Sequence, residues 1–257
     1  TKDENVAISY GMGITAEKVA EQWKVSREEQ DKFAVSSHKK ANQAQIDGLF
    51  KDEILPIDIT CSKLDITKNE VVITTKTITE DEGIRADTTV EGLAKLRPAF
   101  AAKGSVTAGN SSQMTDGAAC IVLVSEEYLK KHNLKPIGRF ISFAVAGVPA
   151  EIMGIGPIKA IPKALAQANL TLEQIDWIEL NEAFAAQGLA VINDLGLDPS
   201  KVNPYGGAIA LGHPLGATGA VLTAKLLHGL RRTGKKYGIV TMCIGTGMGA
   251  AGIFEAL

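Results

Sequence analysis

Three side chains in the last third of the sequence are of types that can transfer a proton or hold a negatively charged oxygen. Asn181 follows a short predicted strand, His213 lies within a glycine-rich segment, and Cys243 ends an apolar run. Alternating glycines follow Cys243 and leave backbone N–H groups free to face an oxyanion. The segment that begins at Cys243 is therefore a candidate for oxyanion chemistry.

Each of these residues also has an ordinary structural explanation. Asn181 equally fits a helix N-cap with Glu182 at the positive end of the same helix, and His213 can cap or hydrogen-bond the backbone of its glycine-rich turn. A lone buried cysteine such as Cys243 is usually a small hydrophobic residue. The glycine-rich segment could also suggest a phosphate loop, but it lacks a following Gly-Lys-Ser/Thr and the GxGxxG order. None of the three motifs identifies a function on its own.

The elements that must position these residues follow an alternating pattern from Pro136 onward. Asn181 comes directly after a predicted strand, at the carboxyl rim of a sheet, where ligands bind in open α/β folds. Gly206 and Gly207 permit positive φ, and Pro214 presets a first helical turn, so His213 is presented at a strand-to-helix elbow. The alternation predicts a layered α/β domain. Predicted strands cover 140–148, 177–180, 238–244 and 251–255, and predicted helices cover 157–168, 182–195 and 215–230.

The first half of the chain has a different pattern. Residues 1–50 are predicted to be helical, with Ser26 and Glu29 as a capping-box pair. Residues 51–91 are densely charged and carry a β-branched run, which predicts an irregular excursion with a short hairpin. The continuous apolar run 118–124 predicts a strand buried on both faces.

Composition excludes several classes of function. The 27 Lys and Arg residues against 29 Asp and Glu give a net charge of −2, which offers no charge argument for binding nucleic acid or an anionic membrane. No apolar run approaches the ~20 residues that span a bilayer. The three cysteines form no CxxC pair, so neither a disulfide scaffold nor a zinc ribbon fits, and we expect no metal site.

Taken together and in this order, the three segments resemble the thiolase family. Its C-terminal half carries Asn-Glu-Ala-Phe, then Gly-Gly-x-x-Ala-x-Gly-His-Pro-x-Gly-x-x-Gly, then Cys-x-Gly-x-Gly-x-Gly, and all three occur here at 181–184, 206–219 and 243–249. Further blocks at 10–17, 95–100 and 107–112 are also similar to thiolase segments. The resemblance covers essentially the whole chain and implies the layered thiolase fold, with a βαβαβαββ C-terminal half and an α+β loop domain.

The resemblance implies the acyl-CoA chemistry of 3-ketoacyl-CoA thiolases and acetyl-CoA acetyltransferases, as in fatty acid β-oxidation. It implies that Cys243 exchanges a proton with the α-carbon of acetyl-CoA, and that His213 activates a nucleophilic cysteine. Asn181 would orient a water in one oxyanion hole, and the backbone of Gly245 would serve the second. The pKa of a thiol, ~8.5, lies closer to the pKa of a weak carbon acid than the pKa of a carboxylic acid does. A neighbouring imidazole and N–H donors can lower a thiol pKa further.

The resemblance also implies the substrate and the partners. Coenzyme A would bind as a substrate, with no permanently bound cofactor, and the protein would be a homodimer or homotetramer. It would be cytoplasmic in a bacterium and mitochondrial or peroxisomal in a eukaryote. Neither nucleic acid nor a membrane is an expected partner. The positions that align with coenzyme A contacts are Met12, Arg85, Phe100, Ala108, Ser112 and Phe184.

One element of the family pattern has no match. The thiolase nucleophile lies in a Ser-x-x-Cys-x-Ser-Gly-like segment, and Cys61 and Cys120 fall in the wrong elements to replace it. We therefore expect this chain to be the C-terminal two-thirds of a thiolase, inactive by itself. Residues 1–114 would form the coenzyme A-binding loop domain, 115–135 the returning end of the N-terminal domain, and 136–257 the C-terminal domain.

Two alternatives from other classes remain. A ketosynthase-like condensing enzyme would use an acyl carrier protein and a Cys-His-His or Cys-His-Asn set, and the segment after Cys243 argues against it. A non-catalytic acyl-CoA-binding half, or one subunit of a split enzyme, agrees with the unmatched nucleophile. The retention of His213 and Cys243 argues against that second alternative.

Overall fold

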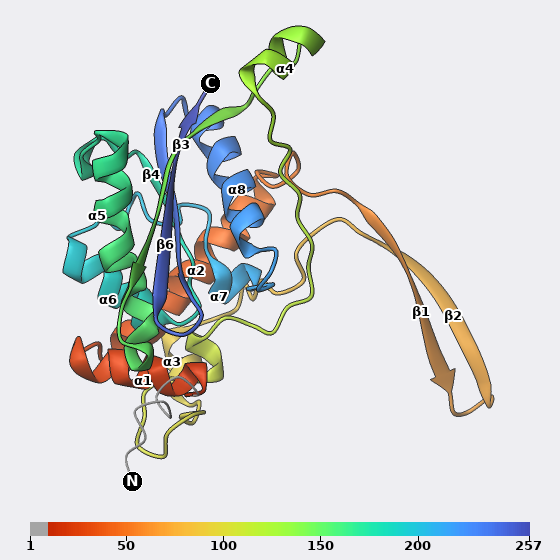
Figure 1. Ribbon diagram of the computed structural model, residues 1–257. Coiled ribbons are helices and arrows are strands. Elements are labelled where there is room, and N and C mark those ends of the chain that lie inside the picture. Colours follow the sequence, from red (N-terminus) through yellow and green to blue (C-terminus); the bar gives the residue numbers. More distant parts are fainter. Residues whose placement is uncertain (1–9) are drawn as a thin grey trace.

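The computed structural model describes residues 10–257 and is built on a four-stranded sheet of order β3-β6-β5-β4 (Figure 1). The strands are β3 (Gly138–Gly147), β4 (Trp177–Leu180), β5 (Tyr237–Ile244) and β6 (Met248–Ala256). β6 pairs antiparallel with both β3 and β5, whereas β4 and β5 are parallel. All four residues of β4 are buried, including Glu179. The strands predicted at 140–148, 177–180, 238–244 and 251–255 are all present.

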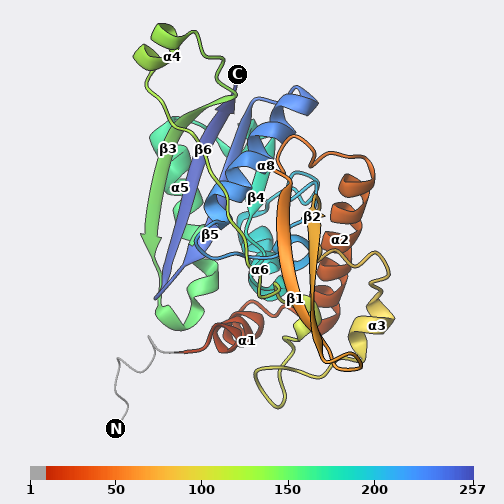
Figure 2. The same cartoon turned by 90° about the vertical axis from the view of Figure 1, so that its right-hand side faces the viewer.

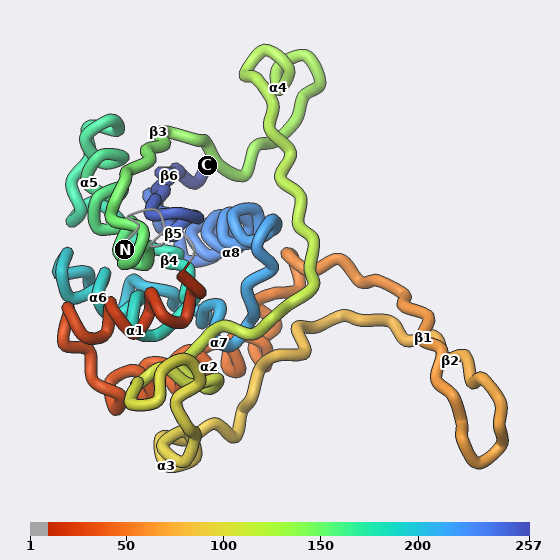
Figure 3. The backbone as a smooth tube through the Cα atoms, turned by 60° about the horizontal axis from the view of Figure 1, so that its bottom comes forward, coloured from red at the N-terminus to blue at the C-terminus, as the bar shows by residue number. Residues whose placement is uncertain are grey.

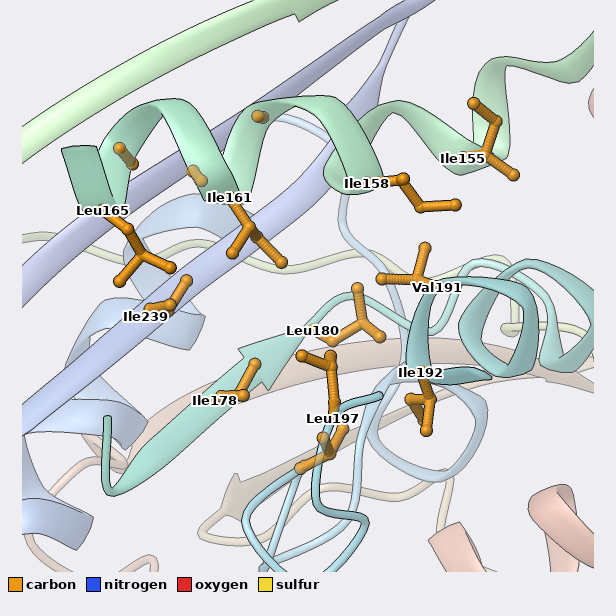
Figure 4. Packing of buried hydrophobic residues seen from close by; sticks show 14 of the residues in the cluster. Ile155, Ile158, Ile161, Leu165, Ile178, Leu180, Val191, Ile192, Leu197 and Ile239 are labelled. Atoms are coloured by element: carbon orange, nitrogen blue, oxygen red, sulfur yellow. The ribbon is translucent and has the colours of Figure 1, made fainter. Parts of the chain in front are cut away.

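One face of the sheet is covered by α5 (Gly156–Ala168), with α6 (Ala185–Leu195) beside it (Figure 4). Ile158, Ile161 and Leu165 lie on one side of α5 because they are three and four residues apart. They belong to a buried cluster that includes Ile239 of β5. This cluster fixes the position of β4, and with it the position of the residue that follows β4.

The other face of the sheet is covered by α8 (Thr218–Thr233), on the side opposite α5 in Figure 1. Leu222, Leu226 and Leu230 form its buried stripe against Trp177 and Val240. The helix ends at Gly234, which has a φ of 64° and closes the last turn in the left-handed conformation. The three-layer arrangement confirms the predicted α/β class.

Two further helices, α1 (Met12–Gln22) and α2 (Arg27–Ile46), pack beside α6. Ser26 and Glu29 form the predicted capping box at the start of α2. The first nine residues of the predicted helical region 1–50 and of the predicted domain 1–114 lie outside the described residues. No helix within 10–257 is both long enough and apolar enough to cross a membrane. The short helices are α3 (Val90–Ala94), η2 (Ala108–Asn110), α4 (Glu126–His132), η3 (Ala150–Ile155), η4 (Leu172–Gln174) and α7 (Ala208–Leu211).

A β-hairpin extends away from the rest of the molecule in Figures 1 and 3, and in Figure 2 it lies in front, on the side toward the viewer. Its strands β1 (Ile57–Asp65) and β2 (Glu70–Ile78) pair antiparallel, and nearly every residue is exposed. The hairpin confirms the excursion predicted for residues 51–91.

Two strand predictions are wrong. Residues 118–124 form no strand, and Val122 and Leu123 are 82% and 79% exposed, because no strand within 10–257 pairs with this segment. The strand that the expected βαβαβαββ order places before the glycine-rich turn is reduced to one bridge, between Ile178 and Val202. The helices predicted at 182–195 and 215–230 both begin three residues later, at Ala185 and Thr218.

Candidate active site

Asn181 and His213 lie side by side at the carboxyl end of β4. The Asn181 N–H donates to the Thr241 carbonyl at 3.0 Å, which extends the β4–β5 pairing by one residue. Its side-chain Nδ2 then lies 3.3 Å from His213 Nε2. Asn181 is fully buried, and its Oδ1 has no hydrogen-bond partner among residues 10–257. Asn181 is not a helix cap, because α6 is capped at Phe184.

His213 is held at both ring nitrogens. Besides the Asn181 contact at Nε2, its Nδ1 lies 2.7 Å from Thr218 Oγ1 at the start of α8. The preceding Gly212 has a φ of 94°, a conformation that glycine adopts without strain. Burial lowers the pKa of His213 below its ordinary value, which favours the neutral imidazole. A neutral ring has one bare nitrogen and can act as a base.

Glu182, the next residue after Asn181, is buried and ties the site to α2. Its Oε2 accepts from Ser37 Oγ at 2.6 Å and from the Ile209 N–H at 3.3 Å, and its Oε1 accepts from Asn203 Nδ2 at 2.8 Å. From sequence, Glu182 fitted a residue at the positive end of a helix. Instead, its carboxylate holds the turn that leads to His213.

That turn depends on Gly206 and Gly207. Gly206 has a φ of 79°, in the left-handed region that favours glycine. A Cβ atom at Gly207 would lie 2.2 Å from the carboxyl carbon of Glu182. The glycines therefore allow the backbone to approach the buried carboxylate closely.

Cys243 lies near the end of β5, opposite Gly249 of β6 in the antiparallel register. It is partly buried and forms no disulfide. Burial raises the pKa of its thiol to about 11 and outweighs a backbone hydrogen bond that lowers it, so the net shift is opposite to the one expected from N–H donors and an imidazole. The thiol is protonated at neutral pH.

A cavity of about 1220 Å³ brings the predicted residues together. Its lining includes His213, Cys243 and Gly245, together with residues from α1, from the segment 112–119 and from the start of α6. Asn181 lies just behind it, in contact with His213. Among the described residues, no group of three or more His, Cys, Asp or Glu side chains could hold a metal ion.

The six predicted coenzyme A contacts divide into two groups. Met12, Ser112 and Phe184 line the cavity, and Phe100 packs edge-on against Phe184 with ring centroids 5.9 Å apart. The Ser112 N–H donates to the Ala183 carbonyl at 2.9 Å, which holds this segment over the cavity.

The other two predicted contacts lie elsewhere. Arg85 and Ala108 are not among the described residues that line the cavity. Arg85 is held instead by its backbone N–H, which donates to His38 Nδ1 at 3.1 Å. Ala108 begins the short helix η2.

Three residues at the site were missed by the sequence analysis. Thr218 contacts His213, Gln187 donates to the Asn181 carbonyl at 3.2 Å, and Met153 lines the cavity. A polar residue in the first turn of each helix was the available signal for Thr218 and Gln187. No sequence pattern indicated Met153, because it lies in the short helix η3, which is too short to show a helical spacing of apolar residues.

Residues 2–127 match the family model described as "Thiolase, N-terminal domain", and residues 134–256 match "Thiolase, C-terminal domain". The chain is 53% identical over 244 residues to the 3-ketoacyl-CoA thiolase of Bacillus subtilis, covering 95% of this chain and 62% of that protein. It is 54% identical over 245 residues to the human peroxisomal 3-ketoacyl-CoA thiolase, covering 95% and 57%. It is 50% identical over 248 residues to the acetyl-CoA acetyltransferase of Shinella zoogloeoides, covering 96% and 61%.

Solved structures show the same fold. The dimeric peroxisomal thiolase of Saccharomyces cerevisiae superposes with a TM-score of 0.87 at 46% identity, covering all of this chain and 63% of that one. The human mitochondrial 3-ketoacyl-CoA thiolase in complex with CoA gives 0.87 at 44% identity, covering 99% and 60%. The chain thus spans about three fifths of the length of these relatives. On the two family models, the sequence identities and the shared fold, the chain belongs to the thiolase family.

Proposed function

We propose that the complete protein cleaves a 3-ketoacyl-CoA with coenzyme A, giving acetyl-CoA and a shortened acyl-CoA, or runs the reverse Claisen condensation. The observation that carries this proposal is the placement of Cys243 and His213 in one cavity, with Asn181 in contact with the imidazole. The similarity to proteins named thiolase and acetyl-CoA acetyltransferase supports the same reaction class.

Cys243 is the proposed acid and base at the α-carbon. In thiolysis, breaking the Cα–Cβ bond leaves the electron pair on acetyl-CoA as an enolate, which must gain a proton. A thiol with a pKa of about 11 holds its proton at neutral pH and can donate it. The thiolate that remains recovers a proton from the thiol of the incoming coenzyme A, which then attacks the acyl-enzyme.

The other three residues bind charge or accept a proton. Neutral His213 accepts the proton of the nucleophilic thiol at Nε2. The buried Oδ1 of Asn181 has no hydrogen-bond partner among the described residues. It can accept a hydrogen bond from a water that faces the thioester oxygen. The N–H of Gly245 serves the second oxyanion, which matches a reaction in which enolate and tetrahedral charges form in turn.

The nucleophile is the part of this proposal that the described residues do not supply. Cys61 is exposed on the projecting hairpin, and Cys120 is exposed and does not line the cavity. We therefore propose that the 257-residue chain does not turn over by itself and that the acyl group is carried by a cysteine outside it.

A second candidate is a non-catalytic acyl-CoA-binding half or one subunit of a split enzyme. The observation that favours it is that Cys243 is the one cysteine among the described residues that line the cavity, where two would be needed. The ketosynthase alternative is weaker, because Cys243 and Gly245 occupy the cavity together with His213.

The partners and the domain plan are part of the same proposal. Acyl-CoA and coenzyme A are the proposed substrates, in a homodimer or homotetramer that is cytoplasmic in a bacterium and peroxisomal or mitochondrial in a eukaryote. We keep the three predicted domains: 1–114 for coenzyme A binding, 115–135 as a returning segment and 136–257 as the C-terminal domain.

Thiolysis of acetoacetyl-CoA tests the proposal. The complete protein, carrying a Cys-x-Ser-Gly segment, should release acetyl-CoA at steady state, and the 257-residue chain free of full-length enzyme should not. Turnover by the 257-residue chain would disprove the proposed need for an outside cysteine. Coenzyme A binding by the complete protein without any turnover would favour the non-catalytic candidate instead.

A further inference from the structure

We propose that Thr218 is a positioning residue that fixes the tautomer of His213, with the proton on Nδ1 and the lone pair on Nε2. The inference concerns the hydrogen bonds at the imidazole, and it rests on the proposed function only for the use of Nε2 as a base. Thr218 is 2% exposed and is the first residue of α8. Its hydroxyl contacts both His213 and the backbone of the preceding turn.

The hydroxyl has one proton to donate, and the backbone takes it. Thr218 Oγ1 donates to the Pro214 carbonyl, four residues earlier, at 3.1 Å. Two other threonines of α8 make the same bond, from Thr223 to the Gly219 carbonyl at 2.7 Å and from Thr233 to the Gly229 carbonyl at 2.8 Å. This bond is a regular feature of threonine within a helix. Once its proton is used, the Thr218 oxygen is left as an acceptor.

An acceptor 2.7 Å from His213 Nδ1 requires the proton to be on Nδ1. A neutral imidazole carries a single N–H, so Nε2 is bare. The Asn181 amide agrees with this assignment, because its Nδ2 donor lies 3.3 Å from Nε2. That distance is long for a hydrogen bond, so an incoming thiol can replace the amide as the partner of Nε2.

The arrangement gives α8 a role in the chemistry beyond packing. The helix begins at Thr218, and its buried stripe is anchored against Trp177 and Val240. The position of the hydroxyl relative to the ring is therefore set by the sheet and not by a mobile loop. A protonated His213 would also keep its Nδ1–H bond, because the threonine oxygen remains an acceptor in both charge states.

The test is the nitrogen spectrum of His213 in the 257-residue chain, labelled with 15N-histidine and sedimented for solid-state NMR near pH 8, above the ordinary histidine pKa of ~6.5. A His213→Gln variant assigns the signals by their loss. We expect Nδ1 in the protonated range and Nε2 in the unprotonated range. The reverse pattern, in which Nε2 carries the proton and faces a flipped Asn181 amide, would overturn the proposal.

Three variants separate a role in tautomer choice from a role in folding. Thr218→Val keeps the shape but removes the hydroxyl, and should give a mixture of both tautomers. Thr218→Ser restores the hydroxyl and should restore the wild-type spectrum. The matched control is Thr223→Val, which loses the same backbone bond without touching His213 and should leave the spectrum unchanged. An unaltered spectrum in folded Thr218→Val would also overturn the proposal.

Kinetics in the complete protein give the functional readout. Thr218→Val should lower kcat about 10-fold or more, with Thr218→Ser close to wild type and Thr223→Val unchanged. KM for coenzyme A should not change, because the hydroxyl does not line the cavity. If the complete protein shows no thiolysis while the tautomer is as expected, the proposed function fails and this inference stands.

Discussion

Ser37 Oγ of α2 lies 2.6 Å from Glu182 Oε2, which joins the first half of the chain to the residue beside Asn181. The same carboxylate accepts from Asn203 and from the Ile209 N–H. A helix remote from the sheet thus helps to hold the turn that carries the candidate base. The first prediction concerns this carboxylate.

Glu182→Gln should lower the free energy of unfolding by about 2–3 kcal/mol. The substitution removes the charge that strengthens three hydrogen bonds and leaves a buried amide facing donors. Urea denaturation measures the change, with the exposed Glu127→Gln as the control, expected within about 0.5 kcal/mol of wild type. Equal stability of Glu182→Gln and wild type would show that this carboxylate does not hold the turn.

The second prediction concerns the buried ion pair between Lys225 and Glu179. The two charges are 2.8 Å apart and almost fully buried, and Lys225 Nζ also donates to the Gly206 carbonyl at 2.6 Å. Lys225→Met should cost about 3–5 kcal/mol, because it leaves a buried carboxylate without its partner. The matched control is Lys130→Met, which breaks an exposed pair with Glu126 and should cost less than about 0.5 kcal/mol.

The third prediction is a pH dependence that arises from Glu53. Burial raises the pKa of this carboxyl from 4.5 to about 7. Below pH 4.5 both the folded and the unfolded states are protonated. Between 4.5 and 7 only the unfolded state ionises, so the free energy of unfolding should fall as pH rises, by about 3 kcal/mol in all.

Glu53→Gln should remove this dependence and stabilise the protein at pH 8 relative to wild type. Urea denaturation at several pH values between 4 and 8 checks it, and the exposed Glu21→Gln is the control. A variant that is less stable than wild type at pH 8 would contradict the assignment.

The fourth prediction concerns Cys243 in the complete protein. Cys243→Ala should leave acylation of the nucleophile possible and lower kcat by ~10²–10⁴, because the α-carbon loses its acid and base. Exchange of the acetyl-CoA methyl protons in deuterated water should slow with it. Exchange at the wild-type rate would show that another group moves this proton.

The fifth prediction is that the isolated 257-residue chain associates or precipitates. Residues 118–124 expose Val122 and Leu123 together with unpaired backbone groups, which form a template for strand pairing. Size-exclusion chromatography should show species larger than a monomer. Hydrogen exchange should find residues 10–125 less protected than residues 136–257, and uniform slow exchange in a verified monomer would refute this.

The sequence predicted elements whose signal is local. The short strand at 177–180, the capping box at Ser26 and the glycine turn before His213 all depend on neighbouring residues, and all are present. The run at 118–124 had an equally clear pattern, but a strand also needs a partner, which no local pattern supplies. Residue type and neighbouring glycines made Asn181, His213 and Cys243 candidates, and the family resemblance supplied their expected roles.

The features that the sequence could not predict depend on contacts between distant segments. The sequence indicates only that Thr218 lies in a helix, whereas the structure shows its hydroxyl in contact with the ring of His213. Glu182 read as a helix-end charge, because its donors come from α2 and from the glycine turn. The Cys243 pKa shifts upward because the thiol is buried, and the neighbouring sequence does not predict that burial.

The order of the strands has a consequence for synthesis on the ribosome. β6 is the last strand within residues 10–257, yet it lies between β3 and β5, and Gly138 pairs with Ala256. During translation β3 therefore has no neighbour in this sheet until β6 emerges, and the cavity cannot close around Cys243 before then. Nascent chains halted before β6 should lack the active site altogether and depend on chaperones to protect an apolar strand.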